Sequence, residues 1–324
     1  MEIGNYDLVA GEKSDPTLNP RQKTTLNKIL EIGGSRPFSE EGISEKLIDI
    51  IQSSTQNTIE RWTEKNLYFT KSQFSSMGKC EGFLVEQKNQ VLSKIPISVI
   101  VGNVAHRAIQ LSYTHSHKNV SEYVKNAIIG MRSADKKIDD WFATSNISEQ
   151  SDIITQATSK VINFLDDWPK LETSWSPRFE EPMSAKIGKI TLSSRADLML
   201  GRVRNDSKRT ILLVDFKSGN LKEEHNDEAM FYALISTLRN GIMPFKSLIY
   251  SLSSGEYAEA DLSLKKMIEF SEEVGRRVNA YVDLFTEKRE PILLTSEQCN
   301  YCPLTKTCLE YKKNAVPNLI ETAL

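Results

Sequence analysis

Asp215 and Lys217 are the two residues of this sequence whose types and spacing point most directly to catalysis. They end an apolar segment, Thr210 to Phe216, that has the character of a β-strand. Because alternate residues of a strand share one face, both side chains lie side by side on the same face. A carboxylate can hold a divalent cation, and a neighbouring lysine can orient a water molecule or help to deprotonate it. The structural alternative is a salt bridge at a strand end.

A second carboxylate, Asp197, lies on the preceding predicted strand, Lys189 to Arg202. Antiparallel neighbours bring residues of one face close together, so Asp197 is expected within a few ångströms of Asp215. Two converging carboxylates suit a hard cation such as Mg²⁺ or Mn²⁺. In the strand before these, Glu180 and Glu181 alternate, so one of them can point toward the same site.

His106 is a third candidate, on a predicted helix from Ser98 to Tyr113. Gly102 lies four residues earlier and therefore on the same helical face. A lone histidine is more often structural than a metal ligand, so its residue type alone leaves the role of His106 open.

The elements that must position these residues predict an α/β fold. A long helical region runs to about Trp168, and three strands then form an antiparallel meander in which Gly188 and Asn205-Asp206-Ser207 supply the turns. A helix, a further strand and a long helix follow. The predicted strands are Arg178 to Met183, Lys189 to Arg202, Thr210 to Phe216 and Phe245 to Ser251, and the later helices are Asp227 to Leu238 and Leu262 to Lys288.

Three motifs carry a family resemblance: Gly102-x3-His106, Arg195-Ala196-Asp197 and the run from Val214 to Gly219. In this order, and on these elements, they resemble the RecB-type branch of the PD-(D/E)xK nuclease superfamily. The resemblance implies an α-βββ-α-β core, a central mixed sheet flanked by helices. It also implies that His106, Asp197, Asp215 and the Phe216 carbonyl hold Mg²⁺ or Mn²⁺, and that Lys217 positions the attacking water.

The sequence departs from the family at one position. The family has a Gln four residues before a Tyr on the next helix, whereas this chain has Glu228 and Tyr232. Glu228 is retained as a catalytic candidate with an altered role. Tyr232 is expected to contact nucleic acid, as is Arg195, for which an ion pair with Glu180 or Glu181 is the alternative.

The chain has four cysteines, three of them in the pattern Cys-x2-Cys-x5-Cys. A cluster of three within ten residues is unusual for free core cysteines, and a disulfide is a weak interpretation in a reducing compartment. A zinc site and an iron–sulfur cluster both remain open from the spacing. The four residues are Cys80, Cys299, Cys302 and Cys308.

The cysteine pattern, with one cysteine before the His106 motif and three after the core, is similar to that of the iron-staple subgroup of RecB-type nucleases. This subgroup includes CRISPR-associated exonucleases and the AddB nuclease domain. This resemblance implies a [4Fe-4S] cluster with a structural role, structural zinc being the alternative. It therefore adds a four-cysteine metal staple over 299–308 to the expected fold.

Composition sets broad limits. The 324 residues carry 41 basic and 43 acidic side chains, a formal net charge of -2. No apolar run approaches the roughly 20 residues of a membrane span, and the first residues lack a signal-peptide core, so we expect a cytoplasmic protein. We expect a helical N-terminal extension, partly ordered, over 1–73 and a nuclease domain over 74–324. Within the latter we expect a helical insertion at about 114–175 and a catalytic core at about 176–290.

These expectations together favour a metal-dependent DNA nuclease, with exonuclease action on single-stranded ends preferred, in repair, recombination or defence. The alternative is a non-catalytic nucleic-acid-binding or scaffold subunit of such a complex. No phosphate-cradling ATPase motif is present, so a helicase or another DNA-processing protein is the expected partner. The oligomeric state is not predicted.

Overall fold

The computed structural model describes residues 17–31, 34–89, 95–115, 119–204, 206–296, 299–300 and 302–315. The chain forms two compact units. The first comprises Met1–Lys46, Ile95–Ala185 and Ser194–Met267, and the second comprises Leu47–Lys94, Lys186–Ser193 and Ile268–Leu324. Residues 1–16 of the expected N-terminal extension lie outside the described part of the chain.

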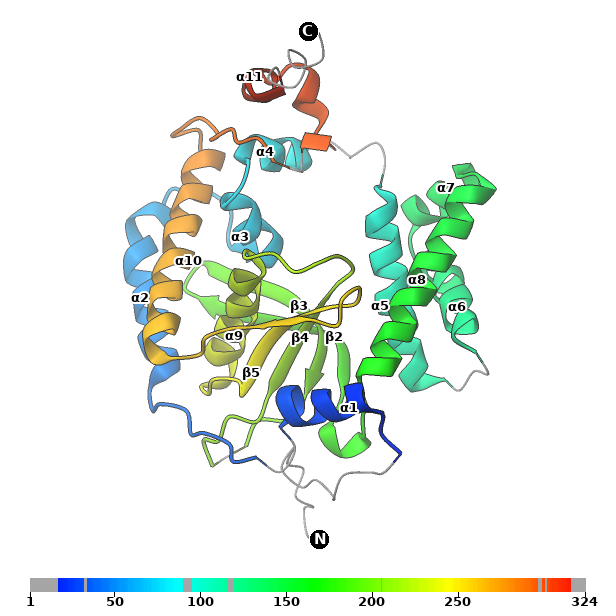
Figure 1. Cartoon of the computed structure of the whole chain (residues 1–324). Coiled ribbons are helices and arrows are strands. Elements are labelled where there is room, and N and C mark those ends of the chain that lie inside the picture. Colours follow the sequence, from blue (N-terminus) through cyan, green and yellow to red (C-terminus); the bar gives the residue numbers. More distant parts are fainter. Residues whose placement is uncertain are drawn as a thin grey trace, which may run out of the picture. The chain divides into compact units, whose positions relative to one another are not determined.

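The described strands form one mixed sheet in the order β1-β3-β4-β5-β6, with β2 paired to β3 (Figure 1). β1 is parallel to β3 and β4 is parallel to β5, whereas β3–β4 and β5–β6 are antiparallel. The predicted meander and the mixed sheet are therefore confirmed. The strands are β1 (Leu67–Thr70), β2 (Arg178–Ile187), β3 (Ile190–Leu200), β4 (Leu212–Lys217), β5 (Lys246–Ser251) and β6 (Tyr257–Glu259).

The register of β3 and β4 determines which side chains meet. Leu198 is paired with Val214, and Asp197 and Asp215 are the next residues beyond this pair on the two antiparallel strands. The other face of β4, which includes Val214 and Phe216, contributes to the hydrophobic core. The alternation of β4 thus separates its charged face from its apolar face, as predicted.

Four helices of the first unit precede the meander: α5 (Ile97–Thr114), α6 (Val120–Ala134), α7 (Lys136–Thr144) and α8 (Ile147–Asp167). α5 packs side by side with α6 and α8 (Figure 1). Each of the last three begins at a side chain, Asn119, Asp135 or Asn146, that accepts a backbone N–H of the first turn. These caps explain how three helices follow one another with short connections.

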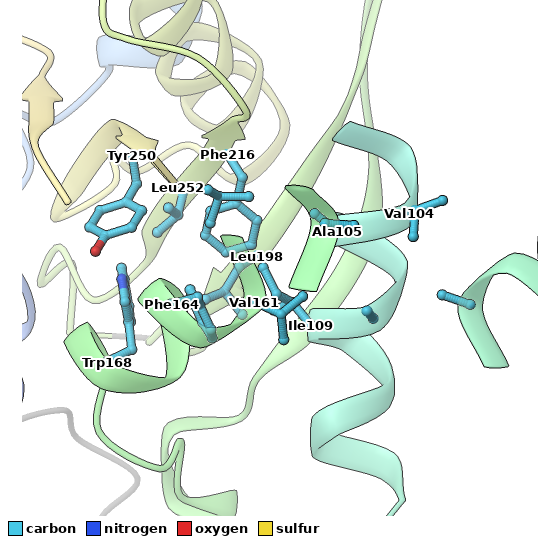
Figure 2. Packing of buried hydrophobic residues seen from close by; sticks show 14 of the residues in the cluster. Val104, Ala105, Ile109, Val161, Phe164, Trp168, Leu198, Phe216, Tyr250 and Leu252 are labelled. Carbon is cyan, nitrogen blue, oxygen red and sulfur yellow. The ribbon is translucent and has the colours of Figure 1, made fainter. Parts of the chain in front are cut away.

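Phe164 near the end of α8 and its C-cap residue Trp168 join this helical layer to the sheet. Phe164 lies edge-on to Phe216 with ring centroids 5.3 Å apart, and Trp168 lies edge-on to Tyr250 at 5.5 Å (Figure 2). Helix α9 (His225–Asn240) packs on β4 and β5 with its own buried face. Because the apolar side chains of β4 belong to the cluster that α5 and α8 share, α9 lies on the opposite face, where Asp215 and Lys217 point.

The N-terminal helices complete the end of α8. α1 (Pro20–Thr24) continues into the π-helical η1 (Thr25–Leu30). Gln22 Nε2 donates to the carbonyls of Leu165 and Trp168, and Thr25 Oγ1 donates to that of Asp167. The last carbonyls of a helix have no partner within it, so these side chains act as a C-terminal cap for α8.

The second unit contains most of α2 (Ile43–Ile59) and α10 (Leu264–Phe285), together with α3 (Lys71–Met77), α4 (Glu81–Asn89), the 3₁₀ turn η4 (Pro303–Lys306) and α11 (Leu309–Ala315). Tyr281 of α10 packs against Trp62 and Phe69, with ring centroids at 6.1 and 5.5 Å. The expected boundary at residue 73 lies inside α3.

Among the described helices, none combines the length and apolar character needed to cross a membrane.

Candidate active site

Backbone and side-chain hydrogen bonds fix the two central carboxylates in the first unit. Asp197 Oδ2 accepts the backbone N–H of Phe216 at 2.6 Å. Asp215 is buried, and its Oδ1 accepts a hydrogen bond from the hydroxyl group of Tyr232. Each carboxylate is thus oriented by its own hydrogen-bond donor: Asp197 by the Phe216 N–H and Asp215 by the Tyr232 hydroxyl group.

His106 comes to this pair from α5. Its Nδ1 lies 3.3 Å from Asp197 Oδ1, and its ring lies edge-on to Phe216 at 5.7 Å. Gly102, one turn earlier, faces Ser218: a Cβ built there would lie 3.4 Å from Ser218 Oγ. The Gly102-x3-His106 spacing therefore lets α5 approach the end of β4 closely enough for His106 to reach Asp197.

Glu180 is the member of the Glu180–Glu181 pair that joins the site. One ligand atom each from His106, Glu180 and Asp197 lie within 4.8 Å of one another. Glu180 has a φ of 52°, in the left-handed region, which is uncommon for a residue with a Cβ and costs on the order of 1–3 kcal/mol. Such strain recurs at functional sites. Oε1 of Glu181 instead lies 4.0 Å from Nη1 of Arg178.

The pKa values of His106 and Glu180 both depend on the nearby charge of Asp197. Burial lowers the pKa of His106, but the carboxylates of Asp197, Asp215 and Glu180 outweigh it, so its net pKa is raised. Burial also raises the pKa of Glu180, and the nearby Asp197 raises it further. Carboxylates that disfavour each other's charge in a buried place are the arrangement that a cation relieves.

Lys217 lies between two carboxylates. Its Nζ is 2.9 Å from Asp215 Oδ2 and 2.6 Å from Glu228 Oε2. Glu228, which stands where the resemblance expects Gln, reaches Lys217 from α9. The replacement thus keeps a hydrogen-bond acceptor at this position and gives it a full charge.

Tyr232 differs from the expectation that it contacts nucleic acid. Only 2% of its surface is exposed, and its hydroxyl group faces Asp215 and the Arg195 carbonyl. Burial, together with Asp215, raises the pKa of Tyr232 well above its ordinary value, so the phenol remains a neutral donor. One turn of α9 separates it from Glu228, so the helix delivers both side chains to β4.

Arg195 projects from β3 into solvent. Its side chain is 66% exposed, and Nη1 lies 3.7 Å from Glu180 Oε2. This is the ion pair that the sequence offered as the alternative to a phosphate contact. At this distance and exposure the pair is weak, and the guanidinium remains accessible.

His225, at the start of α9, is a nearby titratable residue that the sequence left unassigned. Its Nδ1 accepts the backbone N–H of Lys222 at 3.0 Å. Burial lowers its pKa, and the positive charge of Lys217 lowers it further. A neutral imidazole that accepts a backbone hydrogen bond fits a role in ordering the loop before α9.

The donor set fits a divalent cation. His106 Nε2 is buried without a hydrogen-bond partner among the described residues, and the carboxylates of Glu180 and Asp197 lie beside this ring. An imidazole nitrogen and carboxylate oxygens are ligands that Mn²⁺ accepts and, with more oxygens, Mg²⁺ accepts. The structure thus contains an acidic site with the chemistry of a metal centre.

The four cysteines of the second unit line a single cavity. Cys80 precedes α4, and Cys299, Cys302 and Cys308 surround η4. Burial raises the pKa of Cys302, and the other three thiols raise it further. Cys302 is thus close enough to the other three thiols for their charges to raise its pKa.

Comparison with known proteins identifies the family. Residues 83–309, more than half of the chain, match the model of the PD-(D/E)XK nuclease superfamily. The chain belongs to this superfamily and is a nuclease by class, and the predicted α/β core is confirmed. No curated protein matches the sequence. A solved structure from Eubacterium rectale, described as a "Putative exonuclease", is 12% identical, with a TM-score of 0.46 over 80% of this chain and 92% of that one.

Proposed function

We propose that this chain is a Mg²⁺- or Mn²⁺-dependent deoxyribonuclease that hydrolyses phosphodiester bonds at single-stranded DNA ends. One observation carries the proposal: His106, Glu180 and Asp197 converge within 4.8 Å. Asp215 and Lys217, which contact each other at 2.9 Å, lie on the neighbouring strand β4. A structural salt bridge would need only Asp215 and Lys217. It would not require an unpartnered buried imidazole nitrogen beside two further carboxylates.

His106, Glu180, Asp197 and Asp215, with the Phe216 carbonyl, would hold the cation, which when bound polarises the scissile phosphate and acidifies a water molecule. Tyr232 and the Phe216 N–H keep Asp215 and Asp197 in place.

Lys217 directs a proton of its ammonium toward the attacking water and aligns it with phosphorus. Glu228 restrains the Lys217 side chain from the α9 side. Arg195, exposed beside Glu180, is placed to contact a DNA phosphate.

The test compares linear and circular single-stranded DNA, and linear duplex DNA, in the presence of Mg²⁺ or Mn²⁺. The proposal predicts release of short products from linear single strands only. Cleavage of the circle would replace the exonuclease by an endonuclease. Binding of DNA without cleavage under any metal would favour the scaffold alternative.

We further propose that Cys80, Cys299, Cys302 and Cys308 hold a [4Fe-4S] cluster. Their convergence on one cavity supports a shared metal site. The resemblance to the iron-staple subgroup favours a cluster over a single zinc ion.

Anaerobic purification tests this cofactor directly. The proposal predicts brown protein that contains iron and acid-labile sulfide in equal amounts, and a loss of both in Cys80→Ser. Stoichiometric zinc in colourless protein would overturn it. Because a metal that joins distant segments stabilises the folded chain, Cys80→Ser is expected to unfold at a lower temperature.

The biological partner is proposed on the same basis as the activity. Since the sequence contains no phosphate-cradling motor motif, we propose that the nuclease acts with a helicase or another DNA-processing protein in repair, recombination or defence. Co-purification from the native host tests this.

A further inference from the structure

Lys160 of α8 places a positive charge at the end of β4, the strand that carries Asp215 and Lys217. Its Nζ donates to the Ser218 carbonyl at 2.5 Å and to Ser253 Oγ at 2.8 Å. Ser218 directly follows Lys217, and Ser253 belongs to the turn after β5. Lys160 therefore lies where the carboxyl ends of the parallel strands β4 and β5 meet.

The packing of α8 explains this position. Phe164 and Lys160 are four residues apart on α8 and therefore share one helical face, and Trp168 is the C-cap residue of the helix. Trp168, Phe164 and Lys160 face, in turn, Tyr250, Phe216 and the turn residues Ser218 and Ser253. Figure 2 shows the first two of these contacts. The only lysine of α8 thus reaches the carboxyl edge of β4 and β5.

The charge of Lys160 lacks a compensating anion within the described chain. Both of its hydrogen-bond acceptors are neutral. Burial alone lowers its pKa, and no carboxylate contributes to that shift. A half-buried ammonium without a negative partner is costly, and an anion that arrives at its remaining N–H relieves this cost.

The β5–β6 turn next to Lys160 is held in place by hydrogen bonds of Ser251 and exposes two serines. Ser251 Oγ donates to the Gly219 carbonyl and accepts the N–H groups of Ser253 and Ser254, so it holds the two turns of this edge together. Ser253 and Ser254 are exposed. Ser253 Oγ donates its hydrogen to the Ser218 carbonyl, and Ser254 Oγ donates to Glu256 Oε2. The Lys160 ammonium is therefore the phosphate donor of this edge, of the kind that positions DNA without reading its sequence.

We propose that Lys160, beside the exposed β5–β6 turn, binds a phosphate of the DNA strand next to the scissile one. This inference rests on the proposed nuclease function and deepens it. The subsite would hold the strand across the carboxyl edge of β4, so that the scissile phosphate reaches Asp215 and Lys217. It recognises a phosphodiester anion and is indifferent to the base.

The experiment measures binding of a single-stranded oligonucleotide at several salt concentrations in the Lys217→Ala background, which prevents cleavage. Lys160→Gln keeps amide hydrogens for Ser218 and Ser253 but removes the charge. Loss of one phosphate contact predicts several-fold weaker binding, and a slope of log K against log salt that is smaller by about 0.7. Lys160→Arg is expected to retain the slope.

Lys136→Ala is the matched control, because its side chain is 87% exposed on α7 and pairs with Asp140. It removes one positive charge of the same unit and should leave the slope unchanged. An unchanged slope in Lys160→Gln would overturn the subsite and assign Lys160 a purely structural role in the turn.

A parallel cleavage assay with Lys217 intact separates the two proposals. If wild-type protein cleaves DNA while Lys160→Gln has the same KM, the subsite fails and the nuclease stands. If wild-type protein neither cleaves nor binds DNA, the proposed function itself fails.

Discussion

The Nζ atom of Lys217 lies 2.6 Å from Oε2 of Glu228, a carboxylate at the position where the family resemblance expects an amide. This contact and the one to Asp215 at 2.9 Å hold the ammonium from two elements, helix α9 and strand β4. Hydrogen bonds between charged groups are about twice as strong as neutral ones. We therefore propose Glu228 as a positioning residue for Lys217.

Removal of this restraint should slow the chemical step. Glu228→Ala is expected to lower kcat by about 10- to 100-fold, the usual range for a residue that orients a catalytic group, with little change in KM. Glu228→Gln should retain most of the activity because the amide oxygen still accepts a hydrogen bond from Lys217. Equal losses in both variants would show that the charge, and not the restraint, is what matters.

Gly102 controls the approach of α5 to the strand end. A Cβ at this position would lie 3.4 Å from Ser218 Oγ and 3.5 Å from its Cβ, which is ordinary contact. Gly102→Ala should therefore be tolerated, whereas Gly102→Val should push α5 away and draw His106 from Asp197. We expect Gly102→Val to need more Mn²⁺ for half-maximal activity. The same Mn²⁺ requirement in both variants would contradict this role.

His225 should make stability sensitive to acid. Its pKa is lowered in the folded protein by burial and by Lys217, so the unfolded chain binds the proton more readily. The stability it contributes is therefore complete above its ordinary pKa of about 6.5, and is lost as the pH falls through the folded value. His225→Asn keeps an acceptor for Lys222 N–H and removes the titration.

Thermal unfolding at about pH 8 and at about pH 5.5, on either side of the ordinary histidine pKa, checks this. Tm should fall less between the two conditions in His225→Asn than in the wild type. Equal falls would remove His225 from the acid sensitivity.

Glu81 and Arg289 tie the C-terminal segment of the second unit to α4. Arg289 Nη1 and Nη2 lie 2.5 and 2.7 Å from the two oxygens of Glu81, which also accepts the N–H of Ile292. The Glu81 side chain is buried. Glu81→Ala should destabilise the protein by somewhat less than the about 3–5 kcal/mol of a fully buried pair, because Arg289 is partly exposed.

Denaturant unfolding of Glu81→Ala measures this cost. Asp140→Ala, which breaks the exposed ion pair with Lys136, is the control and should cost less than about 1 kcal/mol. Comparable losses in the two variants would argue against a structural role for the Glu81 pair.

Periodicity explains what the sequence could predict. Residues two apart in β4 share a face in any strand, so the neighbourhood of Asp215 and Lys217 followed directly from the chain. The sequence also indicated that an antiparallel neighbour can bring Asp197 near this pair, and in the structure Asp197 and Asp215 directly follow the paired residues Leu198 and Val214. The helices before the meander were recognisable because their apolar residues recur at helical spacing and their starts carry capping residues.

Other features depend on contacts that periodicity does not encode. The choice of Glu180 over Glu181 is made by a left-handed backbone conformation at Glu180. Strand β1 and helix α3 are short and were not predicted, because they are stabilised by packing rather than by their own pattern. The burial of Tyr232 results from how closely α9 packs on β4, and Lys160 is brought to the site only by the docking of α8.

The central claim is that Asp215 and Lys217 form a metal-dependent phosphodiesterase centre. The most direct test is digestion of end-labelled single-stranded DNA by anaerobically purified protein with Mg²⁺ or Mn²⁺, with Asp215→Ala, Lys217→Ala and Lys136→Ala assayed beside the wild type. The account predicts that wild type and Lys136→Ala cleave, and that the other two variants fold but do not. Cleavage by folded Asp215→Ala or Lys217→Ala at the wild-type rate would contradict it.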